Sequence, residues 1–305
     1  MRRLPVIIGI GLLVAGCGAA PAGSLGPVPS GPATSSSPIP SPSGRQTSAA
    51  PSPGGQRPTT PSQPSQQPPR ETSVQLWFIR QGKLFVTEQT GPATTGVGQA
   101  ALDALLTGPS AAGSAAGLRS QIPAGTSLLG LRISAGTATV DLSSSFASAA
   151  SPSTMPLRIA QVVYTLTQFP TVTALRFELD GQGVTVIGGV PVQSPQTRAM
   201  YSGYLPPITV QSPVIGEQIT SPVTVSGTAD VFEAVVSVRV LDSGGHEIAR
   251  NFTTASCGTG CRGTYTVTVS YSVPRTEPGS IEVFESSAKN GQPVNVQLIP
   301  VTLAP

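Results

Sequence analysis

The chain has 305 residues, of which 34 are Gly and 32 are Pro, and only 10% are charged. Its net charge is +3, but residues 71–305 hold 12 basic and 14 acidic side chains, because five arginines precede them. The basic excess of the whole chain is therefore no sign of a nucleic-acid-binding domain, and we expect no nucleic-acid partner.

Residues 1–16 have the pattern of an export signal. Met1-Arg2-Arg3 is a short positive segment, and Leu4 to Ala15 is an apolar run too short to span a membrane but typical of a signal peptide. The run ends at Val14-Ala15-Gly16-Cys17, which resembles the lipobox of bacterial lipoproteins. The alternative is an ordinary secretory signal with an incidental cysteine.

The lipobox resemblance implies that the chain is cut before Cys17, that the Cys17 thiol carries diacylglycerol, and that the new amino group is acylated. Two or three acyl chains anchor a protein stably, whereas one binds only marginally. We therefore expect a protein anchored in the cell membrane by its N-terminal lipid, facing the extracytoplasmic side. No other run approaches 18 apolar residues, so we expect no transmembrane span.

Residues 17–72 are predicted to be a lipidated cysteine followed by a disordered linker. Residues 18–70 contain 14 Pro, 11 Ser and 7 Gly, so they cannot bury enough apolar area to offset the entropy lost on ordering. The functional interpretation is a stalk that holds the folded part away from the membrane. The alternatives are a linker without a selected role and a proline-rich ligand for a partner domain.

Residues 73–195 are predicted to form an α+β domain. The predicted elements, in chain order, are strands over 74–80 and 84–86, a helix over 96–107, strands over 128–133 and 137–141, and a closing hairpin of 174–179 with 184–187. The segment 156–168 fits a helix, but its β-branched centre fits a strand equally well.

The same region resembles the sporulation and spore germination domain called GerMN. The residues that carry the resemblance are Leu106–Pro109, Gly117–Thr126, Val140–Ser143 with Phe146, Tyr164–Pro170, and Phe177 followed by Asp180-Gly181. The resemblance implies a small α/β fold similar to the ring-building modules of secretion machines, with no known catalytic centre. It also implies a helix at 156–168.

The motif residues of this domain have structural explanations. We expect Pro123 and Gly125 to shape a turn, Asp141 to cap the segment that follows it, and Gly181 to take a positive φ.

Residues 207–303 change to a period of two, which predicts an all-β antiparallel sandwich of about seven strands. The alternating positions are Val223 and Val225, Val236 to Val240, Tyr265 to Tyr271, Ile281 and Val283, and Val296 and Leu298.

This second region resembles the immunoglobulin-like domain of bacterial spore germination proteins. The residues that carry it are Val210–Pro213 with Gly216, Ser221-Pro222, Val225–Ala229, Phe232–Ala234, Arg262–Tyr265, and Val283–Ala288 with Gly291. Because the family's molecular role is largely unassigned, the resemblance predicts the fold much better than the function.

Cys257 and Cys261 remain if Cys17 carries lipid, and an exported chain favours pairing them in a disulfide. The alternative is half of a metal site, but that site needs further ligands and His246 is the single histidine of the chain. We therefore expect a disulfide that closes a short loop between two consecutive strands, no metal and no cofactor.

The sequence offers little for catalysis. His246 is the one histidine that could act as a base, and it lies in a glycine-containing turn. Paired carboxylates would have to come from Asp141, Glu178, Asp180 or the second domain, and nothing in their spacing favours this. We therefore expect a protein that is not an enzyme.

Two classes of function remain. The first is a cell-envelope interaction module of sporulation or germination type, in which residues 73–195 bind a protein partner or a second copy. The alternative is a sensor or tether that binds a small ligand or a cell-wall polymer. We favour the first class, because most aromatic residues fall in patterns that place them in the core.

Replacing Cys17 with Ser tests the anchor, because it removes the thiol that the lipid-transfer step requires. We expect the Cys17→Ser protein to lose signal cleavage and to leave the detergent phase in a phase-partitioning assay. Normal cleavage with continued membrane association would rule out lipid anchoring at Cys17.

Overall fold

The computed structural model describes residues 71–149, 151–192 and 195–305. The predicted signal peptide, Cys17 and the predicted linker lie outside the described residues. Within the described part of the chain, no helix is both long enough and apolar enough to cross a membrane.

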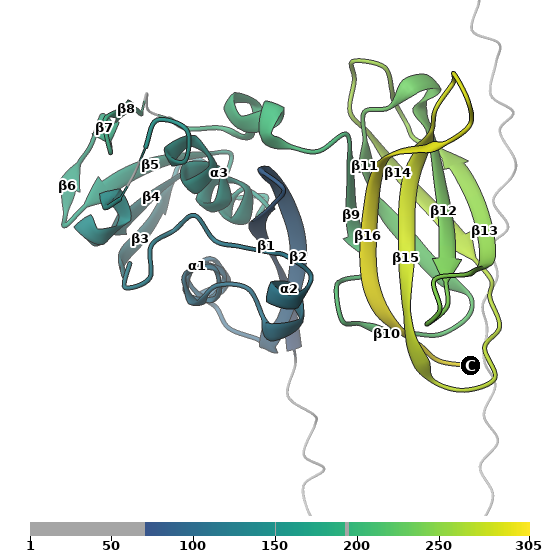
Figure 1. Cartoon of the computed structure of the whole chain (residues 1–305). Coiled ribbons are helices and arrows are strands. Elements are labelled where there is room, and N and C mark those ends of the chain that lie inside the picture. The colour runs from purple at the N-terminus through teal and green to yellow at the C-terminus, as the bar shows by residue number, and fades with distance from the viewer. Residues whose placement is uncertain (1–70, 150, 193–194) are drawn as a thin grey trace, which may run out of the picture. The chain divides into compact units, whose positions relative to one another are not determined.

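The first domain begins with a long antiparallel hairpin of β1 (Glu71–Arg80) and β2 (Lys83–Pro92), as Figure 1 shows. Leu76 to Ile79 are all buried, so the prediction of a strand covered on both faces is confirmed. Gln81 and Gly82 both have positive φ, the geometry of a tight hairpin turn.

Three α-helices follow the hairpin: α1 (Val97–Thr107), α2 (Ala111–Ala115) and α3 (Met155–Leu166). The segment that fitted helix and strand equally well is helical. Pro156 lies in its first turn, and all residues of α3 except Pro156 are buried. Helix α2 was not predicted. Its signal was local, because the Ser110 side chain accepts a hydrogen bond from the Gly113 N–H.

A four-stranded sheet of order β3-β4-β5-β6 completes the domain. Its strands are β3 (Leu128–Ser134), β4 (Thr137–Leu142), β5 (Ala174–Leu179) and β6 (Gln182–Gly183). Strands β4 and β5 are parallel, and the chain between them contains the 3₁₀ turn η1 (Ser144–Ala147) and α3. The predicted α+β class is confirmed.

The predicted closing hairpin is wrong in its second strand. The turn at Asp180-Gly181 is present, but β6 spans two residues. The chain then forms a separate two-residue ladder of β7 (Val186–Ile187) with β8 (Val190–Pro191). The alternation of 184–187 fits an extended chain, and it does not specify which strand that chain pairs with.

Side chains of helix α3 and of the turn that follows it satisfy the free edge of β1. The Gln168 amide accepts from the Gln75 N–H at 2.7 Å and donates to the Gln75 carbonyl at 2.8 Å. The Thr165 hydroxyl accepts from the Trp77 N–H at 3.2 Å, and Gln161 Nε2 donates to the Trp77 carbonyl at 3.0 Å. Gln161 Oε1 also accepts from the Gln121 N–H at 2.8 Å.

The second domain is a sandwich of two sheets, reached through the 3₁₀ segment η2 (Arg198–Tyr204). The five-stranded sheet has the order β10 (Gln218–Ile219), β16 (Pro293–Leu303), β15 (Glu277–Ser286), β12 (Val235–Leu241), β13 (Glu247–Thr254). The three-stranded sheet has the order β14 (Gly263–Val269), β11 (Val223–Ala229), β9 (Ile208–Ser212). The predicted immunoglobulin-like sandwich is confirmed.

The alternation places the predicted valines of β11, β12 and β15 in the core, but it is out of phase in β16. Val296 and Leu298 are exposed, whereas Ile299, Val301 and Leu303 are buried. Leu298 lies in the regular part of the pairing with β15, opposite Glu282, and the buried face of β16 is the one that carries Ile299, Val301 and Leu303.

The structure explains why Gly227 of β11 belongs to the residues that carry the resemblance to the immunoglobulin-like domain. A Cβ atom at this position would lie 1.9 Å from the Thr209 carbonyl oxygen of β9. Only glycine therefore lets the two strands approach at this bulge.

Gln161→Leu should destabilise the first domain, because it leaves the Trp77 carbonyl and the Gln121 N–H without partners. We expect the free energy of unfolding to fall by about 3 kcal/mol. The measurement is urea unfolding followed by the fluorescence of Trp77, the one tryptophan of the chain. Gln99→Leu, on the exposed surface of α1, is the matched control, and equal losses in the two variants would contradict the role assigned to Gln161.

Candidate functional site

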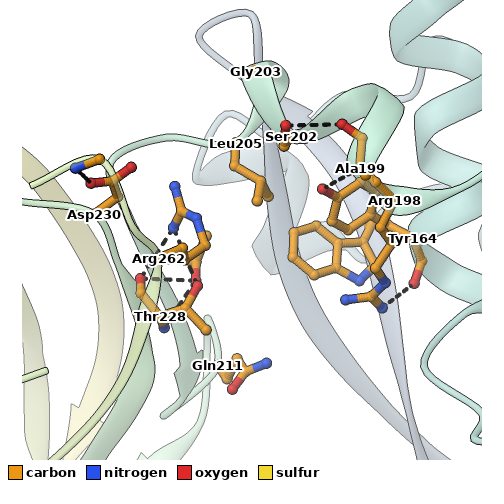
Figure 2. Close-up of a pocket in the computed structure, with 13 residues that line it drawn as sticks. Tyr164, Arg198, Ala199, Ser202, Gly203, Leu205, Gln211, Thr228, Asp230 and Arg262 are labelled. Atoms are coloured by element: carbon orange, nitrogen blue, oxygen red, sulfur yellow. Dashed lines mark hydrogen bonds between the residues drawn. The ribbon is translucent and has the colours of Figure 1, made fainter. Parts of the chain in front are cut away.

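A cavity of about 570 Å³ lies among residues of β1, α3, η2, β9, β11 and the loop before β14. Its polar and charged lining includes Arg198, Arg262, Asp230 and Gln211, and Trp77 and Tyr164 are its aromatic residues. Figure 2 shows Tyr164 and Arg198 on one wall and Thr228 and Arg262 on the other. Cavities of this size hold small-molecule ligands in other proteins.

Arg198 is fixed in place by the last turn of α3. Its Nε donates to the Thr167 hydroxyl at 2.6 Å and its Nη2 donates to the Tyr164 carbonyl at 2.8 Å. Its guanidinium also lies 4.7 Å from the centre of the Tyr164 ring and 5.7 Å from that of Trp77. The cation therefore covers the aromatic rings of its wall.

Arg262 is fixed on the other wall by oxygen atoms of the peptide chain and of a threonine. Its Nη2 donates to the Pro206 carbonyl at 2.7 Å, and its Nη1 lies 3.2 Å from the Thr228 hydroxyl. Both arginines are thus held in one geometry before any ligand arrives.

The electrostatics of the cavity follow from partial burial of both cations. Burial lowers the pKa of Arg198 and the pKa of Arg262 from their ordinary values, while Tyr164 opposes the shift in both and Asp230 does so in Arg262. Burial raises the pKa of Tyr164, against the opposing effect of Arg198 and Arg262. Among the ion pairs of the described residues, neither arginine has a carboxylate within 4.0 Å.

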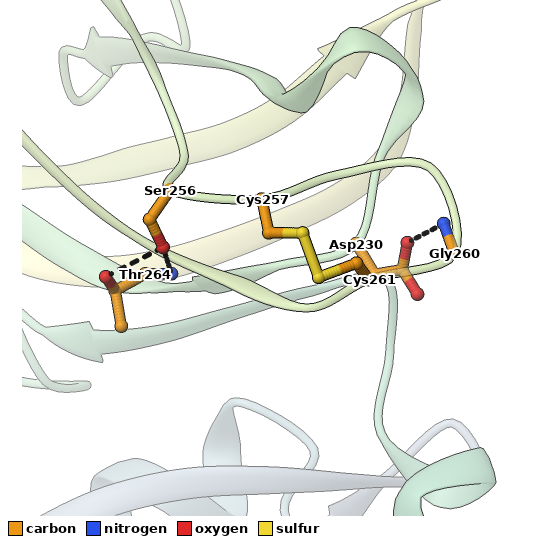
Figure 3. Close-up of a disulfide and its surroundings, with 6 residues drawn as sticks. All are labelled: Asp230, Ser256, Cys257, Gly260, Cys261 and Thr264. Atoms are coloured by element: carbon orange, nitrogen blue, oxygen red, sulfur yellow. Dashed lines mark hydrogen bonds between the residues drawn. A yellow bond between two sulfur atoms is a disulfide. The ribbon is translucent and has the colours of Figure 1, made fainter. Parts of the chain in front are cut away.

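The loop closed by Cys257 and Cys261 supplies part of this cavity. The two sulfur atoms are bonded, with the Cα atoms 5.6 Å apart, and the loop joins β13 to β14 (Figure 3). The Gly260 N–H donates to Asp230 Oδ1 at 2.7 Å, which holds the loop against the chain after β11. Arg262 follows the second cysteine directly, so the disulfide loop precedes one of the two cations.

A second feature is the edge strand β3 of the four-stranded sheet. No further strand pairs with its outer edge within the described residues. Leu129 and Ile133 on this strand are 53% and 46% exposed. A groove of about 430 Å³ runs beside it, and its apolar lining includes Val97, Leu131, Ile133 and Phe169.

The acidic residues considered for catalysis have structural contacts. Glu178 pairs with Arg132 at 2.7 Å. Asp141 was expected to cap the segment after it, and this is wrong: its Oδ1 accepts from the Gly181 N–H at 2.9 Å. Asp180 Oδ1 instead accepts from the Ser144 N–H at 3.1 Å, at the start of η1. Asp141 therefore caps the turn at Asp180-Gly181, and Asp180 caps the turn that begins shortly after Asp141.

The turn predictions for the same motifs are confirmed. The Thr126 N–H bonds to the Pro123 carbonyl at 3.2 Å, and Gly125 and Gly181 have φ of +83° and +75°. These motif residues shape turns of the backbone, as their residue types predict.

His246 is a solvated turn residue, with 81% of its side chain exposed. Its N–H donates to Asp242 Oδ1 at 2.8 Å, and this bond is the main reason why the pKa of Asp242 lies below its ordinary value. Over the ranges that the structure describes, no cluster of three His, Cys, Asp or Glu side chains is arranged to hold a metal ion.

The cavity could not be predicted from the sequence. Its residues come from positions 77 to 262, and none belongs to a short motif with a known chemistry. The one available signal was that Arg198 and Arg262, which lie on either side of the domain boundary, have no acidic residue close to them in the sequence. This signal is too general to identify a site.

Two protein-family models match the chain. Residues 70–185 match the model described as sporulation and spore germination, and residues 207–292 match that of the immunoglobulin-like domain of bacterial spore germination. No curated protein matches the sequence.

Solved structures give weaker similarities. The first GerMN domain of the sporulation protein GerM from Bacillus subtilis is 23% identical over 42% of this chain and 98% of its own, with a TM-score of 0.35. The tandem GerMN domains of the same protein are 14% identical over 77% of this chain and 61% of theirs, with a TM-score of 0.38. A candidate lipoprotein from Clostridium perfringens is 24% identical over 42% and 89%, with a TM-score of 0.32.

Thiol labelling tests the disulfide. We expect neither Cys257 nor Cys261 of the unreduced mature protein to react, and closure of this short loop to contribute about 2 kcal/mol. After reduction, hydrogen exchange should rise in 230–234 and 256–262, because the loop packs on that segment, while β14 stays protected. Two reactive thiols before reduction, or loss of protection throughout the sandwich, would contradict this assignment.

Proposed function

Because this chain joins a sporulation and spore germination domain to an immunoglobulin-like domain of bacterial spore germination, we propose that it is a non-catalytic, membrane-tethered interaction module of the cell envelope. The interaction surface is the outer edge of β3 with its groove. The occupant is the same edge of a second copy, and the sandwich acts as a spacer.

The observation that carries this proposal is the contrast between the two edges of one sheet. On the β5 side, β6 pairs with part of the strand, and Leu175 exchanges two backbone hydrogen bonds with Gln196, at 2.8 and 2.7 Å. On the β3 side, the described residues provide no such cover. Open edges invite pairing with another strand, so proteins usually block them with charge, proline or a covering segment.

Strand β3 has few of these protections. Its sequence is Leu-Leu-Gly-Leu-Arg-Ile-Ser, with no proline and one charge, Arg132. That charge is already paired with Glu178. Added strands bind through main-chain hydrogen bonds, and the neighbouring apolar groove provides contact for their side chains.

A second copy fits this edge because β3 is complementary to itself. If two β3 strands pair antiparallel about Leu131, Arg132 of each copy lies opposite Gly130 of the other. The same register places the exposed Ile133 opposite the exposed Leu129, so apolar side chains meet and like charges do not. Such a two-fold contact uses the same surface on both copies.

Tethering supports a contact of this small size. The predicted lipid on Cys17 and the predicted linker would hold copies near one membrane, which raises their effective concentration without fixing their orientation. The contacts of Asp141, Glu178, Asp180 and His246 are explained by the fold, which supports a role without catalysis.

Cysteine crosslinking in cells tests the register. Chains carrying Leu129→Cys and chains carrying Ile133→Cys, with different tags, should form a mixed disulfide dimer when they are expressed together. Each variant expressed alone should crosslink far less, because neither position lies opposite itself in this register.

Val186→Cys is the matched control, since Val186 is an exposed apolar residue of the same domain outside β3. Equal crosslinking of this control would show random collision. If positions 129 and 133 crosslink only to another protein, the partner at this edge is that protein and not a second copy. If neither product forms, the β3 edge is rejected as the binding surface.

A further inference from the structure

We propose that the cavity between Arg198 and Arg262 is a binding site for an acidic sugar, a hydroxylated ring that carries a carboxylate or phosphate group. This inference does not depend on the β3 contact, because the two features share no residue.

The acid group is inferred from two cations that have no carboxylate within ion-pair distance among the described residues, although Asp230 is close enough to act on the pKa of Arg262. Arg198 and Arg262 line one cavity from two walls, and among the described residues neither has a carboxylate within 4.0 Å. Asp230 is the acidic residue of the lining, and its Oδ1 accepts from the Gly260 N–H. An incoming anion would gain charge-assisted hydrogen bonds from donors that are already held in position.

The sugar ring is inferred from the rest of the lining. Ser202 and Thr228 bring hydroxyl groups to the lining. The Ser202 hydroxyl donates to the Ala199 carbonyl and can still accept. The Thr228 hydroxyl contacts the Thr209 hydroxyl and Arg262 Nη1, which leaves it one further hydrogen bond. The Gln211 amide also lines the cavity, and its side chain makes no hydrogen bond within the described residues. Hydroxyl and amide groups of this kind match the hydroxyls of a sugar.

The aromatic residues favour an acidic sugar over a neutral one. Trp77 and Tyr164 are both almost fully buried, and the Arg198 guanidinium lies over their rings. The rings are therefore not free to stack on a neutral sugar. The buried indole Nε1 of Trp77 lacks an acceptor among the described residues.

The chain contains its own reporter for this site. Trp77 is the one tryptophan of the protein and it lines the cavity, so its fluorescence should change when the cavity is filled. The mature protein is titrated separately with glucuronate and with glucose 6-phosphate, which present the two acid groups on one kind of ring. Glucose is the neutral control, and acetate and inorganic phosphate are the controls for the acid groups alone.

We expect a saturable fluorescence change with at least one of the two acidic sugars. The sugar that saturates the change at the lower concentration identifies whether the site prefers a carboxylate or a phosphate. Arg262→Gln should weaken that binding at least about tenfold, since it removes charge-assisted hydrogen bonds. Arg275→Gln, which removes an exposed arginine outside the cavity, should leave binding unchanged.

Gln211→Ala is the second variant, because Arg262 also holds the Pro206 carbonyl and its loss could disturb the fold. It should weaken the binding of the acidic sugar without changing the unfolding midpoint. Absence of a saturable change with both acidic sugars would overturn the proposal. Equal binding of glucose would overturn the role of the cations, and equal binding of acetate or inorganic phosphate would overturn the role of the sugar ring.

Discussion

The hydrogen bonds from α3 to the edge of β1 are the constraint on which the first domain depends. Strand β1 is buried, so its backbone groups need partners that water cannot supply. Gln161 and Thr165 of α3 provide them together with Gln168 in the turn after the helix. The spacing of four residues places Gln161 and Thr165 on one face of the helix. Gln161 also holds the loop at Gln121, and the same contacts fix Trp77, which borders the cavity. One face of one helix thus sets the strand, the loop and a wall of the candidate site.

Much of this fold could be predicted from the sequence, and the failures have physical causes. The alternation of valines in β11 and β12 identified the sandwich, because a strand with one buried face must repeat every two residues. The centre of α3 could not be classified in this way, since a helix buried on every side has no polar face to reveal its period. The resemblance to a known domain decided that segment. The face of β16 that is buried and the partner of β7 both depend on tertiary pairing, which short-range patterns do not contain.

The candidate sites were less accessible to sequence analysis. The cysteine pair was predictable, because two nearby cysteines in an exported chain have few chemical alternatives. The cavity was not, because Trp77, Arg198 and Arg262 are separated by many residues and meet only after the chain has folded. The open edge of β3 was hidden for another reason. An edge strand and a central strand can have the same alternation, and the difference lies in what the rest of the chain leaves uncovered.

Under the proposed β3 contact, the unequal edges of the four-stranded sheet would also limit the size of the assembly. A sheet with two open edges can add strands in both directions and grow without end. Here Gln196 and β6 close the β5 side, so one direction of growth is removed. Two copies that meet through β3 would bury the open edge of each and leave this sheet no further place to extend. Within the described part of the chain, the proposed contact would therefore give a closed pair and no filament.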